Sequence, residues 1–420
     1  MAPSKSTFAI TALFAGIFAC GLVAPAADAA TESVVYSFQN NGKDGLFPHA
    51  QLTSVNGTLY GTTWNGGTGP CSGGCGAIFS FNPATGAETT LYSFRGTGGY
   101  PKYTSNPESL LAARNSLFGT TLYGGRRGAG MLFSLDLQSS TFRQRYYFCD
   151  LYNCLDGRYP NSGLTDLENT LYGTTSVTGS GGDAGTLFSF DPKTNTHTIV
   201  YTFCSVANCT DGYGPNAGLL SVNGMLYGTT GGGGICSTCG TIYSFDPNSG
   251  VEAVVYSFCA QTCEDGFEPA SNLINSGRTL YGTTVYGGKS GQGTVFSFRL
   301  PDGRENVLHS FAGGTTDGQN PDTGVADLNG VLYGTTASGP NGAYCPSQCG
   351  AVYSVDPKTH SENIVYSFCS QPDCADGAVL TAGLVNVNGT LYGVTAYGGS
   401  GACTNYEEPN GCGTIFAITP

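Results

Sequence analysis

The stretch Leu59-Tyr60-Gly61-Thr62-Thr63 decides the fold, because six further copies of it follow along the chain. The copies start at residues 117, 171, 226, 280, 332 and 391, so consecutive starts lie 52 to 59 residues apart. Two copies vary, with Phe118 in place of the tyrosine and Val394 in place of the first threonine. A period in this range is typical of an array of small structural units. The 420 residues therefore predict one repetitive domain rather than two or three unrelated ones.

Each repeat predicts four short β-strands. In the third repeat we expect them at residues 162–167, 170–175, 186–190 and 196–203. Residues 168–169 join the first strand to the second, and residues 191–195, which favour turns, join the third to the fourth. Seven such units predict an all-β chain folded as a seven-bladed β-propeller of four-stranded blades. An open solenoid is the alternative.

The two ends of the array predict how the ring closes. The array begins at residues 34–38 with a fourth strand that has no first three, and it ends at residues 414–417 with a third strand that has no fourth. We therefore expect the N-terminal strand to pair into the last blade, which removes an exposed sheet edge. Residues 30–420 then form a single propeller.

Residues 1–29 have the features of a secretory signal peptide. Lys5 supplies the positive charge, residues 8–23 are apolar, and Ala27-Asp28-Ala29 fits a small-residue cleavage site. Lipoprotein processing at Cys20 is the alternative, although Phe18 is bulky where a small residue is expected. We expect a secreted or periplasmic protein without a transmembrane segment after cleavage, and without an anchor in its tail, residues 414–420.

The composition argues against some partners. Charged residues make up 11% of the chain, 65 residues are glycine, and the formal net charge is −13. Nucleic-acid binding needs a basic face, so this balance argues against it, and it also argues against docking on anionic lipid. We expect a monomer whose partner is a glycan, an envelope polymer or a protein.

Sixteen cysteines follow Cys20, and they occur as close pairs. In an exported protein such pairs predict local disulfides. The spacing of Cys236, Cys239, Cys259 and Cys263 resembles a zinc ribbon, but other repeats carry one pair alone, so each pair must be self-sufficient. All sixteen fall in the long loops, which the propeller gathers on one side, here called the disulfide-braced face. The predicted bonds are Cys71–Cys75, Cys149–Cys154, Cys204–Cys209, Cys236–Cys239, Cys259–Cys263, Cys345–Cys349, Cys369–Cys374 and Cys403–Cys412.

An Asp-Gly pair precedes most first strands. These aspartates could contact calcium or a sugar in each blade. They could instead hold the connection between blades in shape, while the glycine takes a positive φ. A residue that recurs around a ring usually serves the ring, so the structural interpretation is favoured. The six residues, here called the connection aspartates, are Asp44, Asp156, Asp211, Asp265, Asp317 and Asp376.

A binding site is expected where the repeats differ. The second repeat carries Arg126 and Arg127 in a long loop without cysteines, and residues 95–158 contain eight basic against four acidic residues. Arginine binds carboxylate or sulfate well, which makes this pair a candidate contact for an anionic ligand. Aromatic residues that follow the repeated core are candidates for stacking on a sugar or peptide. They are Trp64, Tyr123, Tyr286 and Tyr397.

The histidines predict little chemistry. His49 follows Pro48 near the expected channel and is a weak catalytic candidate. His309 stands where other repeats have tyrosine, so we expect it to pack. The sequence shows no nucleophile–histidine–acid order and no metal-ligand cluster, and we expect neither a metal nor a cofactor.

The order Leu-Tyr-Gly-Thr-Thr, Gly-Gly and Gly-Thr-Ile-Phe-Ser-Phe-Asp-Pro resembles the Gloeo/Verruco extracellular repeat, found in proteins described as choice-of-anchor tandem repeat GloVer-containing proteins. The resemblance covers residues 34 to 420. It implies bacterial export and a tandem-repeat β architecture, and it supplies no catalytic residues.

The sequence leaves three hypotheses for function. The first is a binding module for a glycan or an envelope polymer on the disulfide-braced face, with Trp64, Tyr123, Arg126 and Arg127 as contacts. The second is a polysaccharide lyase or hydrolase at the channel mouth, near His49 and the connection aspartates, although no convincing general base is visible. The third is a platform for protein interaction.

Overall fold

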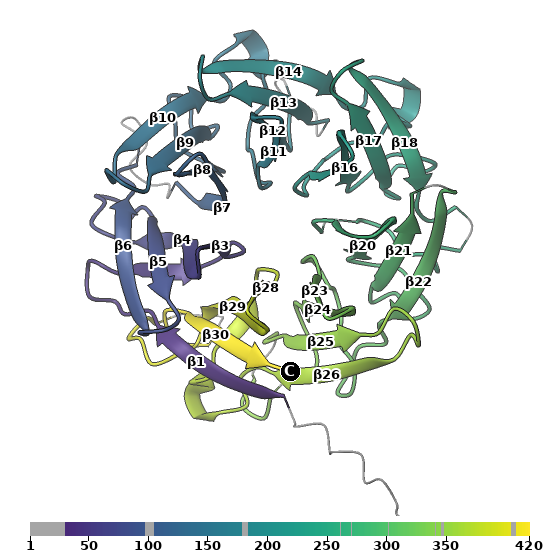
Figure 1. Ribbon diagram of the computed structural model, residues 1–420. Helices are drawn as coiled ribbons and strands as arrows, with labels where there is room; N and C mark the ends of the chain where they lie inside the picture. Colours follow the sequence, from purple (N-terminus) through teal and green to yellow (C-terminus); the bar gives the residue numbers. More distant parts are fainter. Residues whose placement is uncertain are drawn as a thin grey trace, which may run out of the picture.

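The computed structural model describes residues 30–96, 105–178, 184–260, 262–269, 271–300, 302–340, 342–345, 348–404 and 409–420. Within these residues the chain forms seven antiparallel sheets, and Figure 1 shows them arranged as the blades of a ring. The predicted seven-bladed propeller is confirmed. Apart from three single turns of 3₁₀-helix, η1 (Tyr152–Cys154), η2 (Ala207–Cys209) and η3 (Pro372–Cys374), the described elements are all strands.

The strands of each blade follow one another from the centre of the ring outward (Figure 1). The first three blades contain β2 (Gly45–Pro48), β3 (Thr53–Val55), β4 (Thr58–Gly66), β5 (Ala77–Asn82) and β6 (Ala87–Ser93); β7 (Pro107–Ala113), β8 (Ser116–Thr121), β9 (Met131–Asp136) and β10 (Phe142–Tyr147); and β11 (Thr165–Leu167), β12 (Thr170–Thr175), β13 (Thr186–Asp191) and β14 (Thr196–Thr202).

The other four blades repeat this order. They contain β15 (Leu220–Val222), β16 (Met225–Thr230), β17 (Thr241–Asp246) and β18 (Val251–Ser257); β19 (Ile274–Ser276), β20 (Thr279–Thr284), β21 (Thr294–Arg299) and β22 (Arg304–Ser310); β23 (Ala326–Leu328), β24 (Val331–Thr336), β25 (Ala351–Val355) and β26 (Glu362–Ser367); and β27 (Ala378–Leu380), β28 (Val385–Val387), β29 (Thr390–Tyr397), β30 (Thr414–Thr419) and β1 (Thr31–Ser37).

The ring closes as the two ends of the repeat array predict. β1 pairs antiparallel with β30, with Thr31 opposite Thr419 and Ser37 opposite Thr414. The N-terminal strand therefore completes the last blade, and the open solenoid is excluded. Some predicted bounds were wrong. The innermost strand of the third blade, β11, is only three residues long, and residues 161–163, which come before it, line the central cavity.

Aromatic side chains hold neighbouring blades together. At each interface a phenylalanine that follows an outer strand packs against an aromatic ring in the third strand of the next blade, with centroids 4.7 to 5.4 Å apart. Phe258 on Phe296 is one example, and both side chains are fully buried. Such pairs contribute about 0.5–1.5 kcal/mol each beyond the burial of their surface. The recurring Phe-Ser-Phe and Tyr-Ser-Phe patterns supply these contacts.

The repeated glycine allows close packing inside a blade. A Cβ at Gly173 would lie 2.6 Å from the ring of Phe188 and 2.9 Å from Leu164. The second threonine of the motif ties two strands of the same blade. Thr175 Oγ1 accepts a hydrogen bond from the Thr186 amide at 3.2 Å and also bonds the Thr186 hydroxyl at 2.8 Å.

The first threonine links one blade to the next. Thr62 donates to the carbonyl of Pro107 at 3.1 Å, Thr120 to Pro160 at 3.3 Å, and Thr174 to Pro215 at 2.8 Å. Each of these prolines opens the inner segment of the following blade. The motif that sets the repeat therefore also fixes the chain where it enters the centre of the ring.

In several blades the residue before the proline of the inner segment has a left-handed backbone conformation, as Phe47 before Pro48 and Tyr159 before Pro160 show. Phe47 has a φ of 59° and Tyr159 a φ of 58°, which is strained for bulky residues and costs about 1–3 kcal/mol each. The same amides donate to carbonyls of the preceding blade, Phe47 to Cys412 at 3.0 Å and Tyr159 to Ala129 at 2.8 Å. These bonds between blades hold the strained conformation in place.

Candidate functional site

Eight disulfides brace the long loops, and each joins the two cysteines that the sequence pairs. Disulfides in this number persist in oxidising compartments. An extracellular or periplasmic protein fits this chemistry. The predicted signal peptide, residues 1–29, lies outside the described residues. Within the described part of the chain, no helix has the length and apolar character needed to cross a membrane.

The connection aspartates bind the chain itself. Asp156 accepts hydrogen bonds from the Tyr146 hydroxyl at 2.7 Å and from the amides of Asp150 and Leu151 at 2.9 and 3.2 Å. Asp44, Asp211, Asp265 and Asp376 likewise accept from a tyrosine hydroxyl on the preceding outer strand, each at 2.8 Å. These contacts support the structural interpretation. None of the six lines the central cavity, so the fold does not bring them to His49.

The aromatic candidates pack in pairs. Trp64 lies against His49, with ring centroids 3.6 Å apart. Tyr123 packs on Tyr159 at 5.6 Å, Tyr286 on Phe267 at 5.4 Å, and Tyr397 on Phe47 at 5.3 Å. Tyr286 keeps 40% of its surface exposed, which leaves it accessible on the disulfide-braced face.

Arg126 and Arg127 lie apart from His49 and Trp64. Both are exposed in the loop between β8 and β9. The Arg126 guanidinium lies 5.1 Å from the ring centre of Tyr147 on the outer strand β10 and 3.9 Å from the Asp150 carboxylate. Neither arginine lines the central cavity. The structure therefore divides the candidates between an outer edge and the centre of the ring.

A cavity of about 260 Å³ lies at the centre, and residues of all seven blades line it. The lining residues lie where the chain arrives from the disulfide-braced face, just before β3, β11, β15, β19, β23 and β28 and at the start of β7. The cavity is therefore the channel mouth on that face. The lining includes, at one equivalent position in six of the blades, a polar side chain; these six are here called the mouth residues: His49, Glu108, Asn161, Asn216, Asp322 and Thr381.

The mouth residues occupy one position of the repeat. Five of them follow a proline, and Thr381 follows Leu380. The equivalent residue of the fifth blade, 270, lies outside the described residues. Sequence reasoning found only His49. The available signal was one repeat position whose residue type changes from repeat to repeat, with histidine, acid, amide, alanine or threonine, while the surrounding motif stays the same. It becomes visible when the repeats are aligned on the preceding proline, or on Leu380 in the last repeat.

The mouth changes the protonation of its own groups. Burial raises the pKa of Glu108 to about 8 and lowers the pKa of His49 to about 4. Asp322 is open to the channel but surrounded by the blades, and the loss of bulk water raises its pKa as well. At neutral pH the imidazole is therefore neutral, and Glu108 keeps its proton more readily than an ordinary glutamate.

Hydrogen-bonding groups are distributed around the mouth. Asn161 Nδ2 donates to Asn216 Oδ1 at 3.1 Å, and Gln51 donates to the carbonyl of Leu384 at 2.9 Å. A second cavity of about 240 Å³ follows further in, and a row of leucines, Leu52, Leu110, Leu164, Leu219 and Leu273, contributes to its wall. The channel thus offers a polar mouth and a more apolar interior.

Solved structures with low sequence identity share the fold. The extracellular domain assigned to a one-component system of B. thetaiotaomicron superposes with a TM-score of 0.56 at 10% identity, over 92% of this chain and 39% of that one. A second structure of the same extracellular domain, there assigned to a hybrid two-component system, gives a TM-score of 0.55 at 10% identity, over 91% of this chain and 40% of that one. This chain therefore spans about two fifths of each of those proteins.

A weaker likeness is to a nidogen/laminin complex, with a TM-score of 0.41 at 16% identity over 63% of this chain and 81% of that one. No curated protein matches the chain. The model of the Gloeobacter/Verrucomicrobia repeat matches residues 2–238 and 206–406, which together cover most of the sequence. The chain, with its seven repeats and eight local disulfides, belongs to the Gloeobacter/Verrucomicrobia repeat family.

Proposed function

We propose that the protein is an extracellular binding module that takes a glycan or the end of an envelope polymer into the channel mouth on the disulfide-braced face. The observation that carries this proposal is the set of mouth residues, which present different polar groups from one repeat position around a single cavity. Ligand sites in propellers and other ring-shaped folds tend to lie in such concave, convergent places.

The chemistry of the mouth favours a polyhydroxylated ligand. Amide, carboxyl and imidazole groups accept and donate hydrogen bonds in several directions, as sugar hydroxyls require. With His49 neutral and the pKa of Glu108 raised to about 8, the mouth carries less charge than its composition suggests. Trp64 supports this site by stacking on His49. The fold that this chain shares with an extracellular domain of B. thetaiotaomicron, solved twice, is compatible with a binding role.

Two variants separate the two candidate surfaces. Glu108→Gln together with Asn161→Ala alters the mouth, whereas Arg126→Ala together with Arg127→Ala alters the outer edge. Both variants and the wild type are measured for retention on pooled bacterial and plant polysaccharides. We expect the mouth variant to lose at least about tenfold in affinity, which corresponds to about 1.4 kcal/mol, and the arginine variant to bind neutral polymers like the wild type. Unchanged retention by the mouth variant, or no retention by the wild type on any polymer, contradicts the proposal.

A hydrolase or lyase at the same mouth is the second candidate. One observation favours it: Glu108 has a raised pKa, as a general acid needs, in a cavity that also holds Asp322 and His49. Soluble product, assayed in the same incubations, distinguishes the two functions. Product that disappears in Glu108→Gln supports an enzyme, and retention without product supports a binding module.

A further inference from the structure

Polar side chains from adjacent blades meet at the outer rim of the ring. At five interfaces the hydroxyl of a tyrosine on an outer strand donates a hydrogen bond to the connection aspartate that follows it in the chain. The outer strand of the next blade adds a third group, which is a glutamate at four of these interfaces. Tyr256 shows the arrangement, with its hydroxyl 2.8 Å from Asp265 and 3.4 Å from Glu305.

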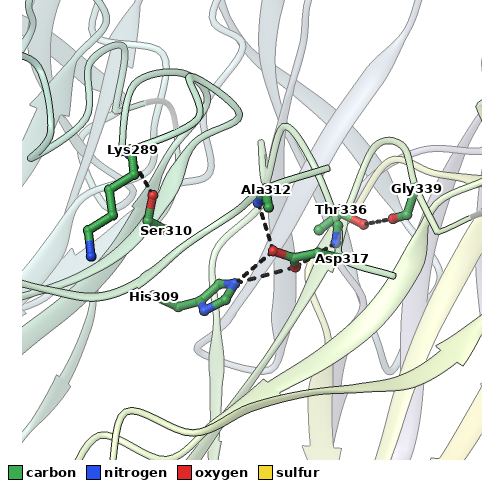
Figure 2. A network of polar contacts seen from close by, with 8 residues as sticks. Lys289, His309, Ser310, Ala312, Asp317, Thr336 and Gly339 are labelled. Carbon is green, nitrogen blue, oxygen red and sulfur yellow. Dashed lines mark hydrogen bonds and ion pairs between the residues drawn. The ribbon is translucent and has the colours of Figure 1, made fainter. Parts of the chain in front are cut away.

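The interface between blades 5 and 6 carries histidine in place of the tyrosine. His309 is the penultimate residue of β22, and Figure 2 shows its ring pointing toward Asp317. The Nε2 atom lies 3.3 Å from both carboxylate oxygens of Asp317, a longer and more symmetrical approach than that of the tyrosines. Asp317 is fixed from its other side by the amides of Ala312 and Gly318, both at 2.7 Å.

Glu362 of blade 6 completes the cluster. One nitrogen of His309 and one oxygen each of Asp317 and Glu362 all lie within 4.8 Å of one another. The Oε1 atom of Glu362 is buried and has no hydrogen-bond partner. Two carboxylates and one imidazole from two adjacent blades therefore converge at one place.

The geometry fits one small divalent ion. Imidazole nitrogen and carboxylate oxygen bind Zn²⁺ at about 2.0–2.2 Å, so two ligands of a tetrahedral ion lie about 3.3–3.6 Å apart. The separation of 3.3 Å between His309 Nε2 and Asp317 matches this distance. The side chains of His309 and Asp317 are 18% and 13% exposed, which leaves access for the ion and for water as a further ligand. A nitrogen ligand favours a transition metal over Ca²⁺.

We propose that His309, Asp317 and Glu362 bind one divalent transition-metal ion, best matched by Zn²⁺, that joins blade 5 to blade 6. Four other connections between blades contain a cysteine pair just before their aspartate, whereas residues 311–317 contain no cysteine. The ion would supply at this connection a cross-link that the chain itself lacks there.

The test uses the mature chain from Ala30, without a histidine tag, stripped of metal and titrated with Zn²⁺ by calorimetry. The bound metal is counted after gel filtration. We expect about one ion per chain, and a midpoint of thermal unfolding that rises with Zn²⁺, because an ion bound only to the folded state stabilises it. No binding by the wild type overturns the proposal.

His309→Tyr is the matched variant, because tyrosine occupies this position at the six other interfaces and the fold should be kept. It should lose the ion or bind it at least about 100-fold more weakly, and its unfolding midpoint should no longer respond to Zn²⁺. His360→Asn changes an exposed histidine elsewhere and should bind like the wild type. Equal binding by His309→Tyr and the wild type would place the ion elsewhere and overturn the assignment.

A gain of binding tests the geometry directly. Tyr256→His puts an imidazole beside Asp265 and Glu305 in the neighbouring interface, which otherwise has the same arrangement. We expect this variant to bind about two ions per chain. A count that stays at one would show that these three residue types at this position are insufficient, which contradicts the geometric argument.

Discussion

Glu108 shows how a single repeat position acquires a different chemistry in each blade. Its backbone is held because Thr62 donates to the carbonyls of Pro107 and Glu108, at 3.1 and 3.2 Å. Its side chain is free to vary because it faces the cavity and not the core. The same is true of His49 and Asp322. Sequence reasoning identified His49 from its position but could not group it with the others, because a site assembled from seven distant segments leaves no local pattern.

The raised pKa of Glu108 predicts a pH dependence. In the unfolded chain this carboxyl loses its proton near pH 4.5, whereas in the folded protein it keeps it up to about pH 8. Between these values the folded state binds more protons, so this group lowers the stability of the fold as the pH rises. The Glu108→Gln variant lacks this penalty. The difference between the thermal unfolding midpoints of the variant and the wild type should therefore grow from pH 5 to pH 8. A difference that stays constant over this pH range would show that the Glu108 carboxyl titrates normally.

The surroundings of His309 could be predicted only in part from its own repeat. The sequence placed it where other repeats have tyrosine and predicted that it packs, and it does lie against Phe311 with ring centroids 4.7 Å apart. Its second neighbour, Glu362, is 53 residues away in the next repeat. Only the alignment of outer strands across an interface brings the two together.

At the scale of elements, the strands were predictable because they repeat. Turn residues and apolar runs recur in register, so strand four of the third blade, expected at 196–203, is found at Thr196–Thr202. The inner strand of the third blade, expected at 162–167, was predicted too long. Its first residues line a cavity, and the apolar pattern does not distinguish this environment from a paired strand. The arginines of residues 95–158 are spread from the connection after β6 to the connection after β10, and an anionic ligand at Arg126 and Arg127 stays a prediction.

The bond from the repeated threonine to the next blade predicts a measurable coupling between elements. Thr62→Val removes the hydroxyl that reaches Pro107, and the isosteric side chain fits, since Val394 occupies this position in the last blade. We expect a loss of about 1 kcal/mol in the free energy of unfolding, the usual net value of a hydrogen bond. Urea unfolding measures it. Thr89→Val on the exposed face of β6 is the control and should change little; equal losses in both variants would contradict a role for the bond.

At the scale of the whole molecule, closure through β1 predicts the effect of removing that strand. A chain that starts after Phe38 would leave β30 as an unpaired edge and would expose the partner surface of Phe79. Unpaired edges favour association between chains. We expect this truncated protein to unfold at a markedly lower temperature and to form dimers or larger species, as light scattering after gel filtration would show. A stable monomer would mean that the pairing of β1 with β30 is dispensable. A synthetic peptide of residues 30–40, added in excess, should restore the monomer.

The pairing of β1 with β30 also sets an order of events for the newly made chain. β1 leaves the ribosome long before its partner β30, and the first six blades and the inner strands of the seventh lie between them. Blades one to six can form as they emerge, while Thr31–Ser37 must wait without a partner until β30 has been made. Closure of the ring therefore requires that β30 has been synthesised, and a chain interrupted before Thr414 cannot close. Such a chain keeps an unpaired strand edge, which quality-control proteases and chaperones can recognise.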